Sequence, residues 1–229
     1  MFNVERTAAQ PGRELQDRKN IFFDLDGTLT DSGSGIINSV LYALEKMAIP
    51  EPYPGELSRF IGPPLHHTFR TRYALTDEDT DRAVRFYREY FSEKGWAENQ
   101  VYAGIGAMLE QLAARYRMFV VTSKPEVFAR RIIAHFELEP FFENITGSRL
   151  DNTMTDKTEL VGHTLSTYKL DPAATIMVGD RKYDIIGAKN NGVAAAGVLY
   201  GYGTEAELLE HRADHLLASV AELNLFLLN

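Results

Sequence analysis

The stretch Ile21–Thr28, with the sequence IFFDLDGT, decides the fold class of this chain. Its apolar first half, rich in aromatic residues, is typical of a buried strand of a parallel sheet. Asp24 and Asp26 lie two residues apart, so in extended backbone both side chains point to the same side. Two carboxylates that close repel each other unless a cation joins them or one of them stays protonated. Mg²⁺ prefers oxygen ligands, so it could join these carboxylates. Gly27 permits a tight turn directly after Asp26.

Two further segments place polar side chains directly after predicted strands. Thr122, Ser123 and Lys124 follow the apolar run 118–121, and Asp180 follows the run 175–178. Asp184 comes four residues after Asp180, about one helical turn later, so both acids can face one site. Each segment also has an ordinary alternative, because serine and aspartate commonly cap helices.

From about residue 105 the chain alternates between predicted helices and strands. The predicted helices are 105–115, 126–135, 157–168 and 182–190, and the predicted strands are 118–121, 144–146, 175–178 and 193–197, with a further strand near 215–218. Such alternation predicts an α/β fold: a doubly wound parallel sheet with a Rossmann-like core. Sheets of this kind bind ligands at the carboxyl ends of their strands, so the polar groups above are expected to converge there.

The segment between the first strand and this alternation has helical periodicity. Helices are expected near 37–47, 65–75 and 79–94, and the residues 31–35 are expected to form a flexible link. We therefore predict a core domain made of residues 19–33 and 101–229, with an inserted all-helical cap domain at 34–100. Residues 1–18 are expected to be a loose N-terminal extension.

Composition narrows the function classes. The 229 residues carry a formal net charge of -8 and contain no cysteine. Acidity argues against nucleic acid and anionic membranes as main partners, and the lack of cysteine excludes disulfides and thiolate metal sites. No apolar run approaches the ~20 residues that span a bilayer. A cytoplasmic protein is expected, and its oligomeric state is left open.

The predicted cluster suits phosphoryl transfer. Asp24 can attack phosphorus and form an acyl phosphate. Asp26 can protonate the leaving oxygen and later deprotonate water. A metal ion would shield the nucleophile from the phosphate. Thr122 can hydrogen-bond a phosphate oxygen, and Lys157, which begins a predicted helix, can balance the carboxylates and bind the transferring phosphoryl group.

These segments resemble the motifs of the haloacid-dehalogenase-like phosphatase superfamily. Asp24, Asp26 and Thr28 match its first motif, Thr122 its second, Lys157 its third, and Gly179, Asp180 and Asp184 its fourth. The resemblance covers about residues 20–200. It implies Mg²⁺ as cofactor, bound by Asp24, Asp180 and the backbone carbonyl of Asp26, and a helical cap inserted after the first motif.

Within that superfamily the chain resembles the phosphoglycolate phosphatase branch. Residues 60–65 resemble the cap loop that faces the substrate, and residues 121–125 resemble a Thr-Asn-Lys-Pro segment with Ser123 in place of Asn. Residues 155–159, around Lys157, depart from the Lys-Pro-x-Pro pattern of that branch and instead resemble the same segment of bacterial 5′-nucleotidase-like relatives. Candidates for substrate contact are Lys124, Gly62, Arg59 and His66, with His67 as a further one.

The predicted function is hydrolysis of a small phosphomonoester, with phosphoglycolate as the first candidate substrate class. The alternatives are a 5′-nucleotidase, a β-phosphoglucomutase-like phosphotransferase and a non-enzymatic phosphoacceptor domain. A dehalogenase acting on carbon has no use for an acid two residues after its nucleophile, so Asp26 argues against it.

Overall fold

The computed structural model describes residues 18–51, 54–151 and 153–229. The predicted N-terminal extension therefore lies outside the described residues except for Arg18. The guanidinium of Arg18 donates to the backbone oxygen of Thr175 at 2.6 Å, which ties the beginning of the described chain to the sheet.

A sheet of six parallel strands forms the centre of the protein, in the order β5-β4-β1-β6-β7-β8. Its strands are β1 (Asn20–Phe23), β4 (Arg117–Pro125), β5 (Asn144–Ser148), β6 (Thr175–Gly179), β7 (Ala194–Val198) and β8 (His215–Leu217). The order reverses at β1, which pairs with β4 on one side and β6 on the other. The predicted doubly wound parallel sheet is confirmed.

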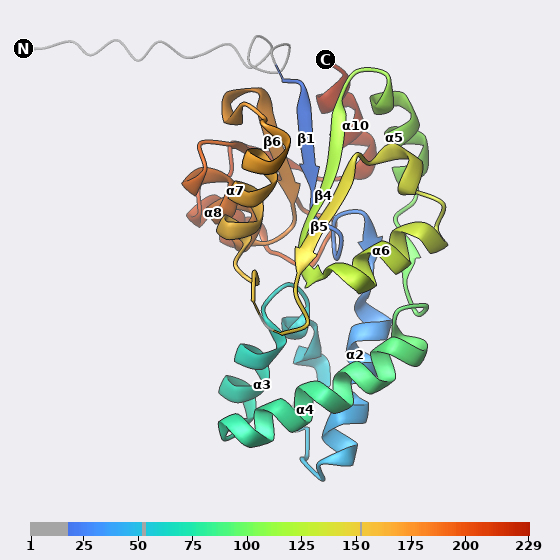
Figure 1. Ribbon diagram of the computed structural model, residues 1–229, viewed down its shortest axis with the longest axis vertical. Helices are drawn as coiled ribbons and strands as arrows, with labels where there is room; N and C mark the ends of the chain where they lie inside the picture. The colour runs from blue at the N-terminus through green and yellow to red at the C-terminus, as the bar shows by residue number, and fades with distance from the viewer. Residues whose placement is uncertain (1–17, 52–53, 152) are drawn as a thin grey trace, which may run out of the picture.

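Both faces of the sheet are covered by helices. Side chains alternate along β1, so Ile21 and Phe23 enter one apolar cluster and Phe22 enters the other. Figure 1 shows α7 and α8 on one side of the sheet, and α5, α6 and α10 on the other. The helices are α5 (Ile105–Ala113), α6 (Glu126–His135), α7 (Lys157–Tyr168), α8 (Lys182–Asn190), α9 (Glu205–Glu210) and α10 (Val220–Leu228). The 3-10 turns η3 (Glu139–Phe141) and η4 (Pro172–Ala174) precede β5 and β6.

A helical layer lies below the carboxyl ends of the strands in Figure 1. It contains α2 (Gly33–Lys46), the 3-10 turn η1 (Pro54–Phe60), α3 (Leu65–Tyr73), α4 (Asp77–Tyr90) and the π-helical turn η2 (Phe91–Gly95). The hydroxyl of Thr76 accepts from the backbone N–H of Asp79, and three acids occupy the first turn of α4. Such a cap and such charges favour a helix start there.

Two short strands carry the chain into and out of the helical layer. β2 (Thr30–Asp31) pairs antiparallel with β3 (Gln100–Val101). The backbone N–H of Tyr102 also donates to the oxygen of Leu29 at 3.2 Å. The layer is therefore attached to the sheet by a paired ribbon.

The prediction of a flexible link over residues 31–35 is wrong. Asp31 lies in β2, and α2 already begins at Gly33. A Cβ atom on Gly35 would lie 1.9 Å from the backbone oxygen of Gly95, so a side chain there would collide with the π-helical turn. The glycine serves close packing between α2 and η2 rather than flexibility.

Strand β4 also extends further than predicted. It continues through Thr122 to Pro125, and its pairing with β5 shifts register between Thr122 and Pro125. In the described part of the chain, no helix has the length and apolar character needed to cross a membrane.

Candidate active site

The carboxyl ends of three neighbouring strands bring the predicted polar side chains together. Asp24 follows β1, Thr122 lies in β4, and Asp180 follows β6. The backbone N–H of Asp24 donates to the oxygen of Val178 at 2.9 Å, so the sheet pairing itself aligns Asp24 with the end of β6. All three side chains are buried.

Asp24, Asp180 and Asp184 form a tight cluster of buried carboxylates. One oxygen from each lies within 4.8 Å of the other two. Lys157, at the start of α7, lies between them: its Nζ is 2.9 Å from Oδ1 of Asp24 and 2.7 Å from Oδ1 of Asp184. The same Nζ donates to the backbone oxygen of Val121 at 3.0 Å. Lys157 thus contacts two of the three acids, Asp24 and Asp184.

The charges of this cluster shift the pKa values of its members. Burial, followed by the charges of Asp184 and Asp24, raises the pKa of Asp180 well above its usual value. Burial alone would lower the pKa of Lys157, but Asp184 and Asp24 outweigh it and raise that pKa above its usual value. Lys157 is therefore charged, and it is a buried cation among three buried carboxylates that disfavour one another's ionisation.

This donor set fits a hard divalent cation. Carboxylate oxygens are the ligands that Mg²⁺ and Ca²⁺ prefer, and a cation would relieve the repulsion that raises the pKa of Asp180. The cluster contains Asp184, whereas the resemblance assigned a ligand role to Asp26. The carboxylate of Asp26 points elsewhere, and the predicted role of its backbone carbonyl stays a prediction.

Asp26 is paired with Lys124. Nζ of Lys124 lies 3.0 Å from Oδ1 and 2.8 Å from Oδ2 of Asp26. The same Nζ lies 4.6 Å from the centre of the Phe91 ring, which belongs to the helical layer. Lys124 is only 8% exposed, so it is a buried partner of Asp26.

The turn after β1 packs against Asp180. Gly27 has a φ of +84°, and a Cβ atom there would lie 2.3 Å from Oδ2 of Asp180, so any side chain would displace that carboxylate. Thr28 donates to Oδ1 of Asp180 at 3.4 Å, and the backbone N–H of Tyr202 donates to Oδ2 at 2.8 Å. The orientation of Asp180 is fixed from both sides.

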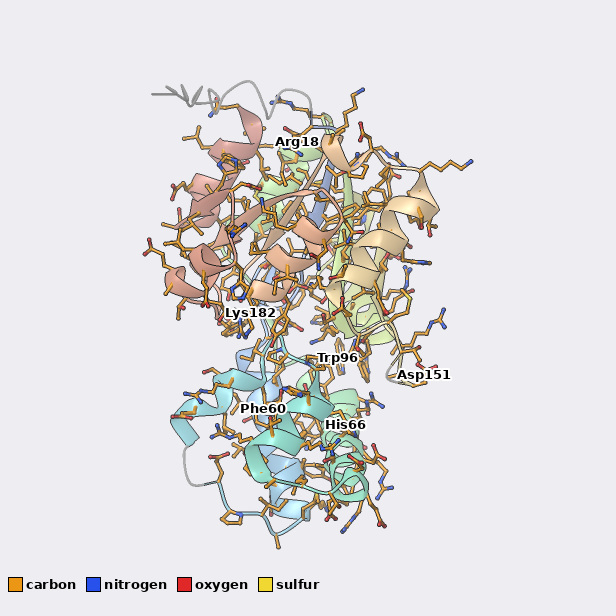
Figure 2. All side chains as sticks on the ribbon, turned by 90° about the vertical axis from the view of Figure 1, so that its left-hand side faces the viewer. Arg18, Phe60, His66, Trp96, Asp151 and Lys182 are labelled. Carbon is orange, nitrogen blue, oxygen red and sulfur yellow. The ribbon has the colours of Figure 1, made fainter. Side chains whose placement is uncertain are left out.

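A cavity of about 630 Å³ opens over this edge of the sheet. The core side contributes Asp24, Asp26, Thr122, Ser123, Lys124, Lys157 and Asp184, and the helical layer contributes Phe60, Gly62, Leu65, His66, His67, Arg70, Tyr87, Arg88 and Phe91. In Figure 2, Lys182 marks the end of the α/β part that faces the layer, and Phe60 and His66 lie within the layer.

The predicted substrate contacts divide into two groups. Lys124, Gly62 and His66 line the cavity, although His66 also lies 3.2 Å from Asp81. Arg59 does not line it: its largely exposed side chain pairs with Glu56 at 3.3 Å. We therefore withdraw Arg59 as a candidate contact. The side chain of Arg59 is 70% exposed.

Sequence reasoning missed several residues of this site. Tyr87 and Phe91 line the cavity and are almost fully buried. Their helical spacing alone predicts only that they pack within the helical layer. Arg181 lines the cavity too and reaches the helical layer. Its position directly after Asp180 was the available signal.

Comparison with known proteins places the chain in a family. Residues 21–198 match the family model described as "Haloacid dehalogenase-like hydrolase". A 5′-nucleotidase from Pseudomonas aeruginosa is 46% identical over 205 residues, covering 89% of this chain and 93% of that protein. The tyrosine-protein kinase PtkA from Mycobacterium tuberculosis is 36% identical over 220 residues, covering 96% of this chain and 74% of that protein.

Solved structures agree with this assignment. The crystal structure of a predicted phosphatase from Clostridium acetobutylicum superimposes with a TM-score of 0.89 at 40% sequence identity, covering 92% of this chain and 98% of that one. The strand order, the strand-end acids and these similarities lead to one conclusion. The protein belongs to the haloacid dehalogenase-like hydrolase family, among that family's phosphatases.

Proposed function

We propose that this phosphatase hydrolyses a small phosphomonoester in the presence of Mg²⁺, through an aspartyl-phosphate on Asp24. The observation that carries the proposal is the cluster of Asp24, Asp180 and Asp184 around Lys157 at the carboxyl edge of the sheet. One oxygen of Asp24 is held by Lys157. The other oxygen is then available for attack on phosphorus from the cavity that Asp24 lines.

The proposed reaction has two steps. In the first, Asp24 attacks phosphorus, the bond from phosphorus to the leaving oxygen breaks, and Asp26 gives that oxygen its proton. In the second, Asp26 takes a proton from water, the water oxygen attacks phosphorus, and Asp24 is released. A Mg²⁺ ion held by Asp24, Asp180 and Asp184 would neutralise charge between nucleophile and phosphate.

Several side chains support these steps. Thr122 and Ser123 line the cavity beside Asp24 and are proposed to hydrogen-bond the phosphoryl oxygens. Lys157 orients Asp24 by contacting both that acid and Asp184. Lys124 holds both oxygens of Asp26 in the substrate-free protein. A substrate must therefore compete with this pairing before Asp26 can donate its proton.

The preferred substrate class is a nucleoside 5′-monophosphate. The P. aeruginosa relative named as a 5′-nucleotidase supports this choice over phosphoglycolate. The cavity of about 630 Å³ is also large for a two-carbon phosphate, since ligand pockets for larger molecules span ~300–1,000 Å³. We propose that the helical layer, residues 34–100, acts as a cap over the cavity. It supplies the aromatic and basic side chains that face the leaving group.

A substrate panel tests this proposal. Phosphate release is measured with nucleoside 5′-monophosphates, 2-phosphoglycolate, sugar phosphates and an aryl phosphate, each with Mg²⁺ and with EDTA. The highest kcat/KM is expected for a nucleoside monophosphate, with loss of activity in EDTA. A higher kcat/KM for 2-phosphoglycolate would instead favour phosphoglycolate as the substrate class. Transfer of phosphate to a hexose phosphate instead of water would favour the phosphotransferase.

A further inference from the structure

Arg181 connects the carboxylate cluster to the helical layer. Its backbone N–H donates to Oδ2 of Asp184 at 3.0 Å. Its guanidinium leaves the core, and Nη1 donates to the backbone oxygen of Ile61. Ile61 begins the loop 61–64, which joins η1 to α3. One residue thus contacts an acid of the proposed metal site through its backbone and the helical layer through its side chain.

Glu207 holds the Arg181 side chain in this position. Nε of Arg181 lies 3.0 Å from Oε1 of Glu207, and Nη2 lies 3.5 Å from Oε2. The same Oε1 accepts the backbone N–H of Lys182 at 2.8 Å. The two side chains are only 14% and 19% exposed. Paired arginine and carboxylate groups of this kind give geometric specificity.

The loop is fitted against this arginine. Gly62 has a φ of +100°, and a Cβ atom on it would lie 3.0 Å from Cγ and 3.1 Å from Nη1 of Arg181. Gly62, Pro63 and Pro64 all line the cavity. In Figure 2, Lys182, the neighbour of Arg181, lies at the end of the α/β part that faces Phe60. The place of the loop over the cavity therefore depends on where the guanidinium lies.

We propose that Arg181, held by Glu207, is a positioning residue that fastens the loop 61–64 over the active-site cavity. Opening the loop breaks its hydrogen bond to Arg181, and closing it reforms that bond. The loop lines the cavity on the side of the helical layer, which under the proposed function faces the leaving group. Loss of the fastening is therefore expected to weaken substrate binding more than it slows bond breaking. Arg181 acts through the loop, so it differs from the acids that perform the proposed chemistry.

The test uses Arg181→Met and Glu207→Gln in the full-length protein. Hydrogen exchange of the backbone amides of residues 57–62 is measured without substrate, because Pro63 and Pro64 carry no amide hydrogen. The values of kcat and KM are measured with an aryl phosphate and a nucleoside monophosphate. Arg181→Met is expected to speed exchange of this loop and raise KM by ~10-fold, the usual consequence of losing a hydrogen bond to a charged group, while kcat falls less than about threefold. Glu207→Gln is expected to speed loop exchange and to raise KM as well, each by a smaller factor than Arg181→Met.

A matched control comes from the opposite end of the sheet. Arg117 forms a similar two-bond pair with Glu143, at 2.6 and 2.7 Å, far from the cavity. Arg117→Met is expected to leave loop exchange and KM unchanged.

Unchanged loop exchange in both Arg181→Met and Glu207→Gln overturns the proposal. A rise in KM with unchanged exchange also overturns it, since Arg181 would then act only by touching substrate. Loop exchange needs no turnover, so this result stands even if the proposed substrate class is wrong. If Arg181→Met fails to fold, the Glu207→Gln variant carries the same test.

Discussion

The edge of the sheet and the helical layer face each other across one cavity, but their charges are organised differently. At the sheet edge, Lys157 and Lys124 are buried, and each pairs with at least one buried acid at 2.7–2.9 Å. On the part of the layer that lines the cavity, Arg70 pairs with Asp77 and His66 with Asp81, through side chains that are 33% to 71% exposed. A more buried pair of the layer, Arg72 with Glu51, lies outside the cavity lining. Buried pairs are rigid and depend on both partners, whereas exposed pairs contribute little. The difference suggests that the edge performs the chemistry and that the layer selects the substrate.

Substitution of Asp24 tests the catalytic side of this comparison most severely. Asp24→Asn removes the proposed nucleophile while keeping its shape. We expect kcat to fall on the order of 10⁴-fold or more, as for loss of a nucleophile in other enzymes. Phosphate release from an aryl phosphate measures it. The matched control Asp171→Asn changes an acid that only caps the turn η4, and its kcat should match the wild type. Activity near wild type in Asp24→Asn would refute Asp24 as nucleophile.

Substitution of Asp26 should have the next largest effect. Asp26→Asn removes proton transfer, and we expect a loss on the order of 10²–10⁴ in kcat. The loss in kcat/KM, which reflects the first step and not the later proton transfer from water, should shrink for substrates whose leaving group is a weak base, because such groups need no proton. Comparing an aryl phosphate with an alkyl phosphate measures this dependence. An equal loss on both substrates would argue that Asp26 acts through its pairing with Lys124 instead.

Lys157 should matter for stability as well as activity. Lys157→Met leaves buried acids without their cation, and breaking such a pair costs ~3–5 kcal/mol of unfolding free energy. Urea denaturation in EDTA measures the change. Lys189→Met is the control, because Lys189 pairs with Asp214 at a partly exposed site, where a pair contributes only ~0–1 kcal/mol. Equal losses in the two variants would show that the buried cluster does not depend on Lys157.

The layer should give the smallest effects. His66→Ala removes a side chain that lines the cavity. We expect KM for a nucleoside monophosphate to change a few-fold, in line with a single polar contact, and KM for a small aryl phosphate to stay constant. Arg59→Ala, at a side chain outside the cavity, should change neither. A large fall in kcat for His66→Ala would show that the helical layer takes part in the chemical step, which contradicts the division of roles between the two regions.

The sequence predicts the strand-end residues and the main helices of both regions well, but not the side-chain contacts between distant residues, for a physical reason. Asp24, Thr122 and Asp180 follow or end apolar strands, and parallel pairing alone brings strand ends together. The contact between Lys124 and Asp26 instead joins side chains far apart in the sequence and depends on rotamers. The bond from Arg181 to Ile61 has the same character.

Gly35 shows a second limit of sequence reasoning. A glycine near polar residues suggests a flexible link, yet here it allows α2 to approach the carbonyl of Gly95. Only the packed structure distinguishes these two uses of a glycine. Helix α4 shows the same limit. Helical spacing predicts that Tyr87 is buried, but it cannot show that Tyr87 also lines the cavity.

The central claim is that Asp24, Asp180 and Asp184 share a divalent cation. Because the folded pKa of Asp180 lies above its unfolded value, the contribution of this acid to stability is fully present below its unfolded pKa and is lost as pH rises through the folded pKa. Mg²⁺ binds the ionised acids, so it offsets this loss mainly at higher pH.

The direct measurement is the Tm of the wild type and of Asp180→Asn, with and without Mg²⁺, at about pH 5 and about pH 8. Mg²⁺ is predicted to raise the Tm of the wild type, more at the higher pH, and to leave Asp180→Asn unchanged. A Mg²⁺ effect that is absent from the wild type, or equally large in Asp180→Asn, would contradict the claim.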